Sequence, residues 1–164
     1  MFQKYRIEIK WAGILILMTI TWMFIEKLTG LHDQYISRHA AYTNLIAIPA
    51  VLIYVFCLLE KRKKVLNNEM SWSQGFGSGM LMTVIVAACA PLTQYIVLNF
   101  ITPHYFENMI KLVIDKHIMS PEQAAAYFTL PMYIVNSIFG TIIMGMVIVP
   151  LVALFTQKKK KSNV

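Results

Sequence analysis

The chain has 164 residues, of which 57% are hydrophobic and 14% are charged, and its formal net charge is +7. Soluble domains carry about 25% charged residues, so an ordinary soluble enzyme, a disordered chain and a disulfide-stapled domain all fit poorly. The composition instead indicates a small membrane protein that crosses the bilayer several times.

Charged residues divide the chain into apolar stretches. No Asp, Glu, Lys or Arg occurs in residues 11–25, 39–59, 70–106 and 123–157. A helix rises about 1.5 Å per residue and a bilayer core is about 30 Å thick, so about 20 apolar residues cross it. We therefore predict an all-α integral membrane protein, a single membrane domain over residues 1–164, with transmembrane helices near 8–30, 41–60, 75–101 and 130–156.

The first predicted span has to include an acidic residue. The apolar run from Trp11 to Ile25 covers only about 22 Å as a helix, so the span must continue through Glu26 and Lys27. The Lys27 side chain can extend to the headgroups, whereas the shorter Glu26 side chain cannot reach as far. We expect Glu26 at or just inside the outer interface, with a partner or water, and an ionisable group there is a functional candidate.

The segment 103–129, between the third and fourth spans, is predicted to be an outer amphipathic helical segment. Its apolar residues recur at helical spacing, which favours a helix lying on the membrane surface. They are Tyr105, Phe106, Met109, Ile110, Val113 and Ile114. Ser120, Pro121 and Gln123 then form a helix-start pattern. That helix should continue toward the last span, where Pro131 either kinks it or begins a new helix.

The distribution of Lys and Arg orients the predicted spans. Eleven of these residues flank the span ends on one side, and four flank them on the other. The first group is Lys4, Arg6, Lys10, residues 61–64 and residues 158–161; the second is Lys27, Arg38, Lys111 and Lys116. The positive-inside rule therefore predicts that both termini face the cytoplasm. The basic tail is explained by the anionic inner leaflet, so no nucleic-acid partner is expected.

Several segments together resemble a bacterial family catalogued as domain of unknown function 4199. They are residues 22–33, 42–44, 75–79, 91–95, 102–108, 124–128 and 140–145, which distribute the resemblance over nearly the whole chain. The resemblance implies a four-helix integral protein of the bacterial inner membrane, and it leaves the activity open.

All four histidines lie on or near the predicted outer side, and carboxylates accompany them. The histidines are His32, His39, His104 and His117. His32 and Asp33 lie in the first outer loop, and His104 and Glu107 are three residues apart, so a helix would put both on one face. Imidazole and carboxylate groups bind zinc and other divalent ions, which makes His32, His104 and Glu107 metal candidates. The alternative is that outer loops simply carry polar residues. A complete ligand set is not visible, and no cofactor is expected.

Polar and small residues also lie within the predicted spans. Gln94 in the third span and Asn136 in the fourth could line a cavity or proton path, or they could hydrogen-bond between helices for about 0.6 kcal/mol each. Four glycines favour close helix packing, within one chain or between copies. They are Gly75, Gly79, Gly140 and Gly145.

The sequence carries no nucleophile motif, phosphate loop or dinucleotide fingerprint, so no catalytic residues are assigned and a non-enzymatic role is favoured. We predict an accessory or scaffold subunit of the inner membrane that contacts lipids and either a second copy of itself or another membrane protein. The alternative is a small oligomeric transporter or channel, with Glu26 and the polar face of Thr83, Gln94 and Asn136 along its path.

Overall fold

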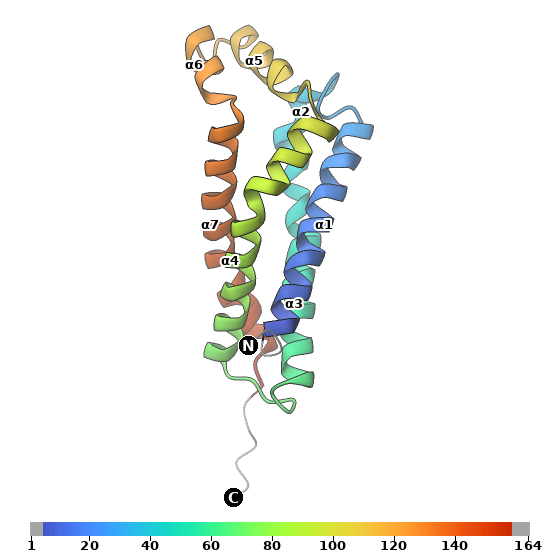
Figure 1. Cartoon of the computed structure of the whole chain (residues 1–164), viewed down its shortest axis with the longest axis vertical. Coiled ribbons are helices and arrows are strands. Elements are labelled where there is room, and N and C mark those ends of the chain that lie inside the picture. Colours follow the sequence, from blue (N-terminus) through green and yellow to red (C-terminus); the bar gives the residue numbers. More distant parts are fainter. Residues whose placement is uncertain (1–4, 159–164) are drawn as a thin grey trace, which may run out of the picture.

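The computed structural model describes residues 5–158, which form a bundle of long helices closed at one end by short ones (Figure 1). Four helical segments are long and apolar enough to cross a membrane: Arg6–Leu28, Ile36–Lys64, Trp72–Ile101 and Leu130–Thr156. This confirms the prediction of an all-α chain with four membrane-spanning helices. Lys4 and residues 159–161 of the predicted cytoplasmic clusters lie outside the described residues.

Two of the long segments are composite. The second consists of α2 (Ile36–Tyr42), a 3₁₀ turn, η2 (Thr43–Ile46), and α3 (Ala47–Lys64). The third consists of α4 (Trp72–Ile96), which continues as a π-helical turn, η3 (Val97–Ile101). The second segment therefore begins before the predicted residue 41, and the π-helical turn was not predicted. Such turns occur frequently at functional sites in helical proteins.

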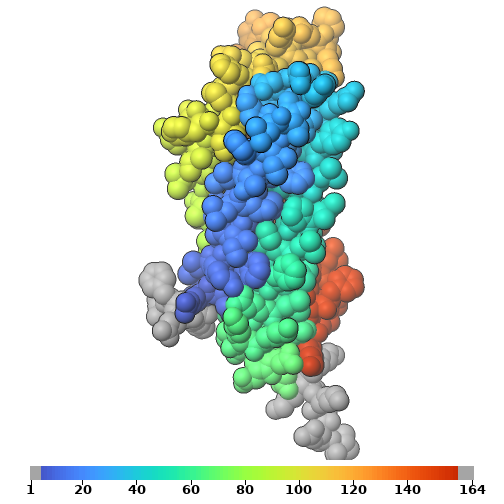
Figure 2. All heavy atoms as spheres, turned by 90° about the vertical axis from the view of Figure 1, so that its right-hand side faces the viewer, coloured from blue at the N-terminus to red at the C-terminus, as the bar shows by residue number. Residues whose placement is uncertain are grey.

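The two ends of the bundle differ (Figure 1). At the first end, which we name the capped end, the loop 29–35, α2, α5 (Tyr105–Asp115) and α6 (Pro121–Tyr127) close the bundle. At the second, which we name the terminal end, α1 (Arg6–Leu28) begins, α7 (Leu130–Thr156) finishes, and the loop 65–71 joins α3 to α4. Figure 2 shows α1 and α3 along one face of the bundle, with α5 and α6 above them.

The helix starts at the capped end follow from local sequence. The Ser120 hydroxyl accepts a hydrogen bond from the Gln123 amide at 3.3 Å, and the Gln123 side chain accepts one from the Ser120 amide at 3.1 Å. This is the expected capping box, with Pro121 in the first turn. The helix stops at Tyr127, and Pro131 lies in the first turn of a new helix, α7. Pro131 therefore begins a helix instead of kinking one.

The apolar face of α5 is covered by the chain itself. Val113 of α5 packs with Ala124 and Phe128, and Phe106 and Tyr133 lie against this cluster. The prediction placed this face on the membrane surface. In the structure, α6 folds back against it, so the apolar area is removed from solvent within the same chain.

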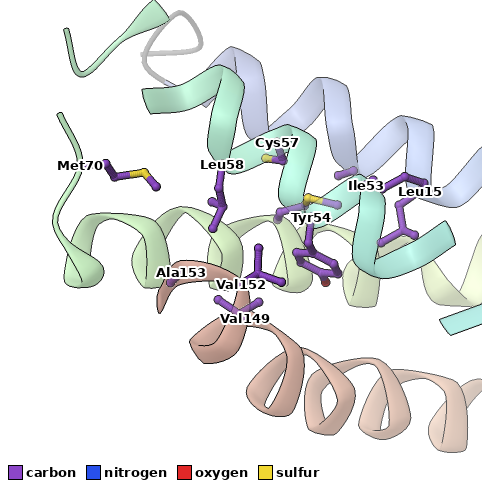
Figure 3. Packing of buried hydrophobic residues seen from close by; sticks show 11 residues of the cluster. Leu15, Ile53, Tyr54, Cys57, Leu58, Met70, Val149, Val152 and Ala153 are labelled. Carbon is purple, nitrogen blue, oxygen red and sulfur yellow. The ribbon is translucent and has the colours of Figure 1, made fainter. Parts of the chain in front are cut away.

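The main hydrophobic core lies in the half of the bundle nearest the terminal end. Figure 3 shows Tyr54 and Leu58 of α3 directed toward Val149 and Val152 of α7. Cys57 and Leu58 are fully buried in this cluster. Because lipid tails are as apolar as these side chains, close van der Waals packing is what stabilises this half of the bundle.

Glycines permit the close approach of α4 and α7. A Cβ atom at Gly79 would lie 2.6 Å from Val149 Cγ1, and one at Gly145 would lie 2.6 Å from Thr83 Oγ1. A Cβ atom at Gly75 would lie 3.2 Å from Ala153 Cβ. These three predicted packing glycines therefore make their contacts within one chain. A Cβ atom at Gly140, the fourth predicted packing glycine, meets no atom within 4 Å.

A matched pair of substitutions tests this packing. Gly145→Ala should lower the free energy of unfolding by about 1–3 kcal/mol, because the added methyl group overlaps Thr83 in a packed interface. Gly140→Ala should be neutral or stabilising by up to about 1 kcal/mol, because alanine is the better helix former and has open space there. Unfolding midpoints in detergent measure both, and equal midpoints would contradict the packing argument.

Candidate functional site

The carboxylate of Glu26 lies near the end of α1, where it is 2% exposed. Trp22, one turn earlier on the same helix, donates its indole N–H to Glu26 Oε1 at 2.7 Å. His32 Nε2 lies 3.1 Å from Glu26 Oε2, and His39 Nε2 lies 3.3 Å from the same oxygen. The acidic group that the sequence placed at the interface is thus buried among three side chains.

A left-handed glycine brings His32 back over the end of α1. Gly30 has φ +76°, a conformation that glycine adopts at low cost, and Leu31 donates its amide to the Glu26 carbonyl at 2.9 Å. The chain therefore reverses directly after the helix. Lys27 pairs with Asp33 at 2.7 Å, which places the predicted candidate Asp33 beside the Glu26 site, in an ion pair of its own.

Helix α5 holds the loop over this site. Asn108 donates to the His32 carbonyl oxygen at 2.9 Å and to Asp33 Oδ1 at 3.1 Å. The Tyr105 hydroxyl lies 3.4 Å from His39 Nδ1, and the Tyr105 ring packs edge-on against both imidazoles. Burial raises the pKa of Tyr105, so its hydroxyl stays protonated and is able to donate to His39.

Two imidazole nitrogens of the site have no hydrogen-bond partner among residues 5–158: Nδ1 of His32 and Nε2 of His39. Both are buried, and His39 Nε2 lies at ion-pair distance from Glu26 without hydrogen-bond geometry. Each of Glu26, His32 and His39 offers one ligand atom, and these three atoms lie within 4.8 Å of one another. The site can therefore hold a metal ion.

A small cavity of about 110 Å³ adjoins the two imidazoles. Its other lining residues are Thr19, Met23, Thr93, Gln94, Val97, Leu98, Thr102, Tyr105 and Tyr133. A groove of about 620 Å³ lies next to it among α1, η2, α3, α4 and α7, and Thr19, Gln94 and Tyr133 line both spaces. The cavity beside the imidazoles is thus adjacent to a groove at the level of the spanning helices, with these three side chains in the walls of both.

The predicted site residues are distributed over three places. His104 and Glu107 pair with each other at 3.2 Å, with side chains 67% and 78% exposed, and neither belongs to the Glu26 group. Of the three predicted metal candidates, only His32 lies in that group. Gln94 lines the cavity, and Asn136 lines the groove, where its amide donates to the Tyr127 hydroxyl at 3.4 Å.

Sequence reasoning missed two members of the capped-end site. His39 was noted only as an outer histidine, although α2 begins at Ile36 and brings it to Glu26. Tyr105 was assigned to the apolar face of an amphipathic helix, and its hydroxyl instead contacts His39. The available signal was that all four histidines and Glu26 were predicted on one side of the membrane.

A second buried carboxylate, at the terminal end, was also missed. Glu8 is 1% exposed, with Lys61 Nζ 2.8 Å from its Oε1, and the Ser78 hydroxyl donates to the same oxygen at 2.6 Å. These contacts join α1, α3 and α4. Because a cationic side chain and a hydroxyl of the same fold pair with Glu8, this site has the character of a structural ion pair.

Four long apolar helices with a buried acid–histidine site at one end define a small protein built to cross a membrane several times. The chain belongs to the family described as protein of unknown function, DUF4199, whose model matches residues 10–158. No protein with curated annotation and no solved structure matches it.

Removing the Glu26 carboxylate should destabilise the capped end. Glu26→Ala leaves the buried Trp22 indole N–H and His32 without their acceptor, so the free energy of unfolding should fall by about 2–3 kcal/mol. Glu107→Ala removes an exposed carboxylate and should change it by less than about 0.5 kcal/mol. Denaturant titration in detergent measures both, and a Glu26→Ala change as small as that of Glu107→Ala would refute the buried network.

Proposed function

We propose that this protein binds a single-chain amphipathic molecule from the membrane, with the polar head in the cavity beside the Glu26 site and the apolar chain in the groove. The observation that carries the proposal is that the two spaces adjoin each other, since Thr19, Gln94 and Tyr133 line both. A ligand that occupies both spaces needs a polar head group for the cavity and an apolar chain for the groove in one molecule.

The lining of the groove supports an amphiphile over an inorganic ion. Its polar members are mostly hydroxyl and amide side chains: Thr19, Thr43, Asn44, Tyr54, Gln94, Tyr133, Asn136, Ser137 and Thr141. Its apolar members include Leu15, Val86, Met144 and Ile148. Asn44 and Asn136 are exposed, and Met144 is 49% exposed, so the groove opens at the surface of the spanning helices, where lipids lie.

The amide of Gln94 supports a polar group in the cavity. No hydrogen bond of this side chain is found within residues 5–158, although it lies within the third spanning segment and is half-buried. An amide that loses water without a partner costs about 1–3 kcal/mol. A ligand head group or ordered water in the cavity would supply that partner.

A binding role is better supported than conduction. The groove reaches Leu15 and Tyr54 at the edge of the core cluster. The rest of that cluster, which fills the half of the bundle near the terminal end and includes Leu58, Met82 and Val149, lines neither space. Among the described residues, the side chains of this cluster pack closely against one another. The alternative of a small transporter for a polar solute would need this core to open.

The accessory or scaffold role predicted from the sequence loses two of its supports. The apolar face of α5 is covered by α6 and the start of α7, and Gly75, Gly79 and Gly145 serve packing between α4 and α7. Neither surface is therefore free for a second protein. The small size of the chain still favours an accessory role. Native mass spectrometry in mild detergent would test this role, because a partner of defined mass should then remain bound to the chain.

The location we propose is the bacterial inner membrane, with both termini in the cytoplasm and the capped end outside. Lys and Arg residues near the terminal end, such as Arg6, Lys10 and residues 61–64, support this orientation. A reporter fused after Lys161 should behave as cytoplasmic, and one inserted near His117 as external. The reverse pattern would overturn the orientation.

A photoreactive fatty acid tests the binding site. In the wild-type chain, crosslinks should concentrate in residues 136–148 of α7 and near Ala47 and Ala50 of α3, which line the groove. Gly140→Leu should reduce that labelling to background, because Gly140 lines the groove and a side chain there has open space to occupy.

The matched control is Gly77→Leu. Gly77 also has open space around a Cβ atom, but it does not line the groove. Its labelling should equal that of the wild-type chain. Labelling spread evenly over all lipid-facing helices, or unchanged by Gly140→Leu, would refute a specific amphiphile site.

A further inference from the structure

We propose that Glu26, His32 and His39 bind one divalent first-row transition-metal ion, with an open coordination position that faces the cavity. This inference goes beyond the proposed function, since it assigns an ion to the site and does not depend on the amphiphile.

The ligand set is the first observation. Two imidazoles and one carboxylate suit zinc and its neighbours in the first transition row, and three protein ligands with an open fourth position are typical of reactive zinc sites. In a tetrahedral site with bonds of about 2.0–2.1 Å, neighbouring ligand atoms lie about 3.3 Å apart. The distances from Glu26 Oε2 to His32 Nε2 and His39 Nε2 are 3.1 and 3.3 Å.

The unpartnered nitrogen of His39 is the second observation. A network made of hydrogen bonds alone would be expected to satisfy its buried polar atoms. His39 Nε2 is buried and faces Glu26 Oε2 at 3.3 Å, yet it has no hydrogen-bond partner among the described residues. A metal ion among the three ligand atoms would use the free His39 nitrogen directly.

The charge balance is the third observation. Glu26 has no Lys or Arg ion pair among residues 5–158, and its neighbours are two imidazoles and an indole. With neutral imidazoles, the buried carboxylate keeps an uncompensated negative charge, which is costly in a low-dielectric region. A divalent cation supplies the missing positive charge, and binding requires the imidazoles to be neutral.

The surroundings complete a metal site. The Tyr105 hydroxyl lies 3.4 Å from His39 Nδ1, so it can orient the ring through the nitrogen that does not face Glu26. Tyr105 and Thr102 line the cavity beside both imidazoles, which leaves room for water or a ligand atom on the ion. With an amphiphile in the groove, its polar head would lie next to this position.

The test uses the full-length chain, purified in detergent through an affinity tag without histidine and stripped with a chelator. Zn²⁺ is titrated in competition with a chromogenic chelator, and Co²⁺ is added separately to record its visible absorption. We expect one Zn²⁺ per chain and the intense absorption band of a low-symmetry, four-coordinate Co²⁺ site. The Co²⁺ spectrum needs no variant, so it tests the site even where a substitution impairs folding.

His39→Ala and His104→Ala form the matched pair. His39→Ala should weaken Zn²⁺ binding by at least about 100-fold, since loss of an outer-shell partner alone costs about 10- to 100-fold. His104→Ala removes an exposed imidazole that also pairs with a carboxylate, and it should bind Zn²⁺ like the wild-type chain. Absence of stoichiometric Zn²⁺ binding, full binding by His39→Ala, or an equal loss in His104→Ala would overturn the proposal.

The result is separable from that of the fatty-acid experiment. Gly140→Leu changes the groove and none of the three ligands, so it should keep its Zn²⁺. A chain that binds Zn²⁺ without specific fatty-acid labelling supports the metal site and refutes the amphiphile. Specific labelling without Zn²⁺ binding does the reverse.

Discussion

The buried carboxylate of Glu26 is the constraint on which the capped end depends. Taking a carboxylate out of water costs several kcal/mol, and that cost is offset only when donors or cations surround the group. The donors come from α1, from the loop after it and from α2, with Trp22 and His32 in hydrogen-bond contact. The reversal at Gly30 and the hydrogen bonds of Asn108 follow as the means of holding those donors in place.

A second constraint, the close contact of α4 with α7, divides the bundle into a packed half and a hollow half. The α7 residues in the main core are Val149, Val152 and Ala153, whereas the groove is lined by α7 residues between 133 and 148. Helix α7 therefore packs against α3 near the terminal end and leaves space nearer the capped end. The groove therefore begins at the edge of the main core, where Leu15 and Tyr54 belong to both.

The spans could be predicted from the sequence because they depend on local composition. The third segment ends at Ile101, as predicted, since Thr102 and Pro103 break the apolar run. The second begins at Ile36, earlier than predicted, because α2 starts before the charge-free stretch, which opens at His39. A hydrophobicity pattern does not register such polar helical extensions.

The site could be predicted only in part, because its members meet through tertiary structure. Glu26 was identifiable from its position in a span, and so was its need for a partner. His39 is a partner of Glu26, whereas His104 is not. This difference depends on the chain reversal at Gly30 and on the docking of α5, which are tertiary features. The groove depends on the divergence of α7 from α3, which no residue pattern within either helix encodes.

The two buried carboxylates of α1 have different surroundings. Glu8 lies 2.8 Å from Lys61 Nζ and accepts a hydrogen bond from the Ser78 hydroxyl, so its ion-pair partner comes from within the fold. Glu26 lies among imidazoles, whose charge depends on what they bind. In the metal site that we propose, a divalent ion would complete the charge balance at Glu26. Of the two carboxylates, Glu26 is the one whose imidazole neighbours line the cavity, so a species bound there would contact the structure that closes over the site.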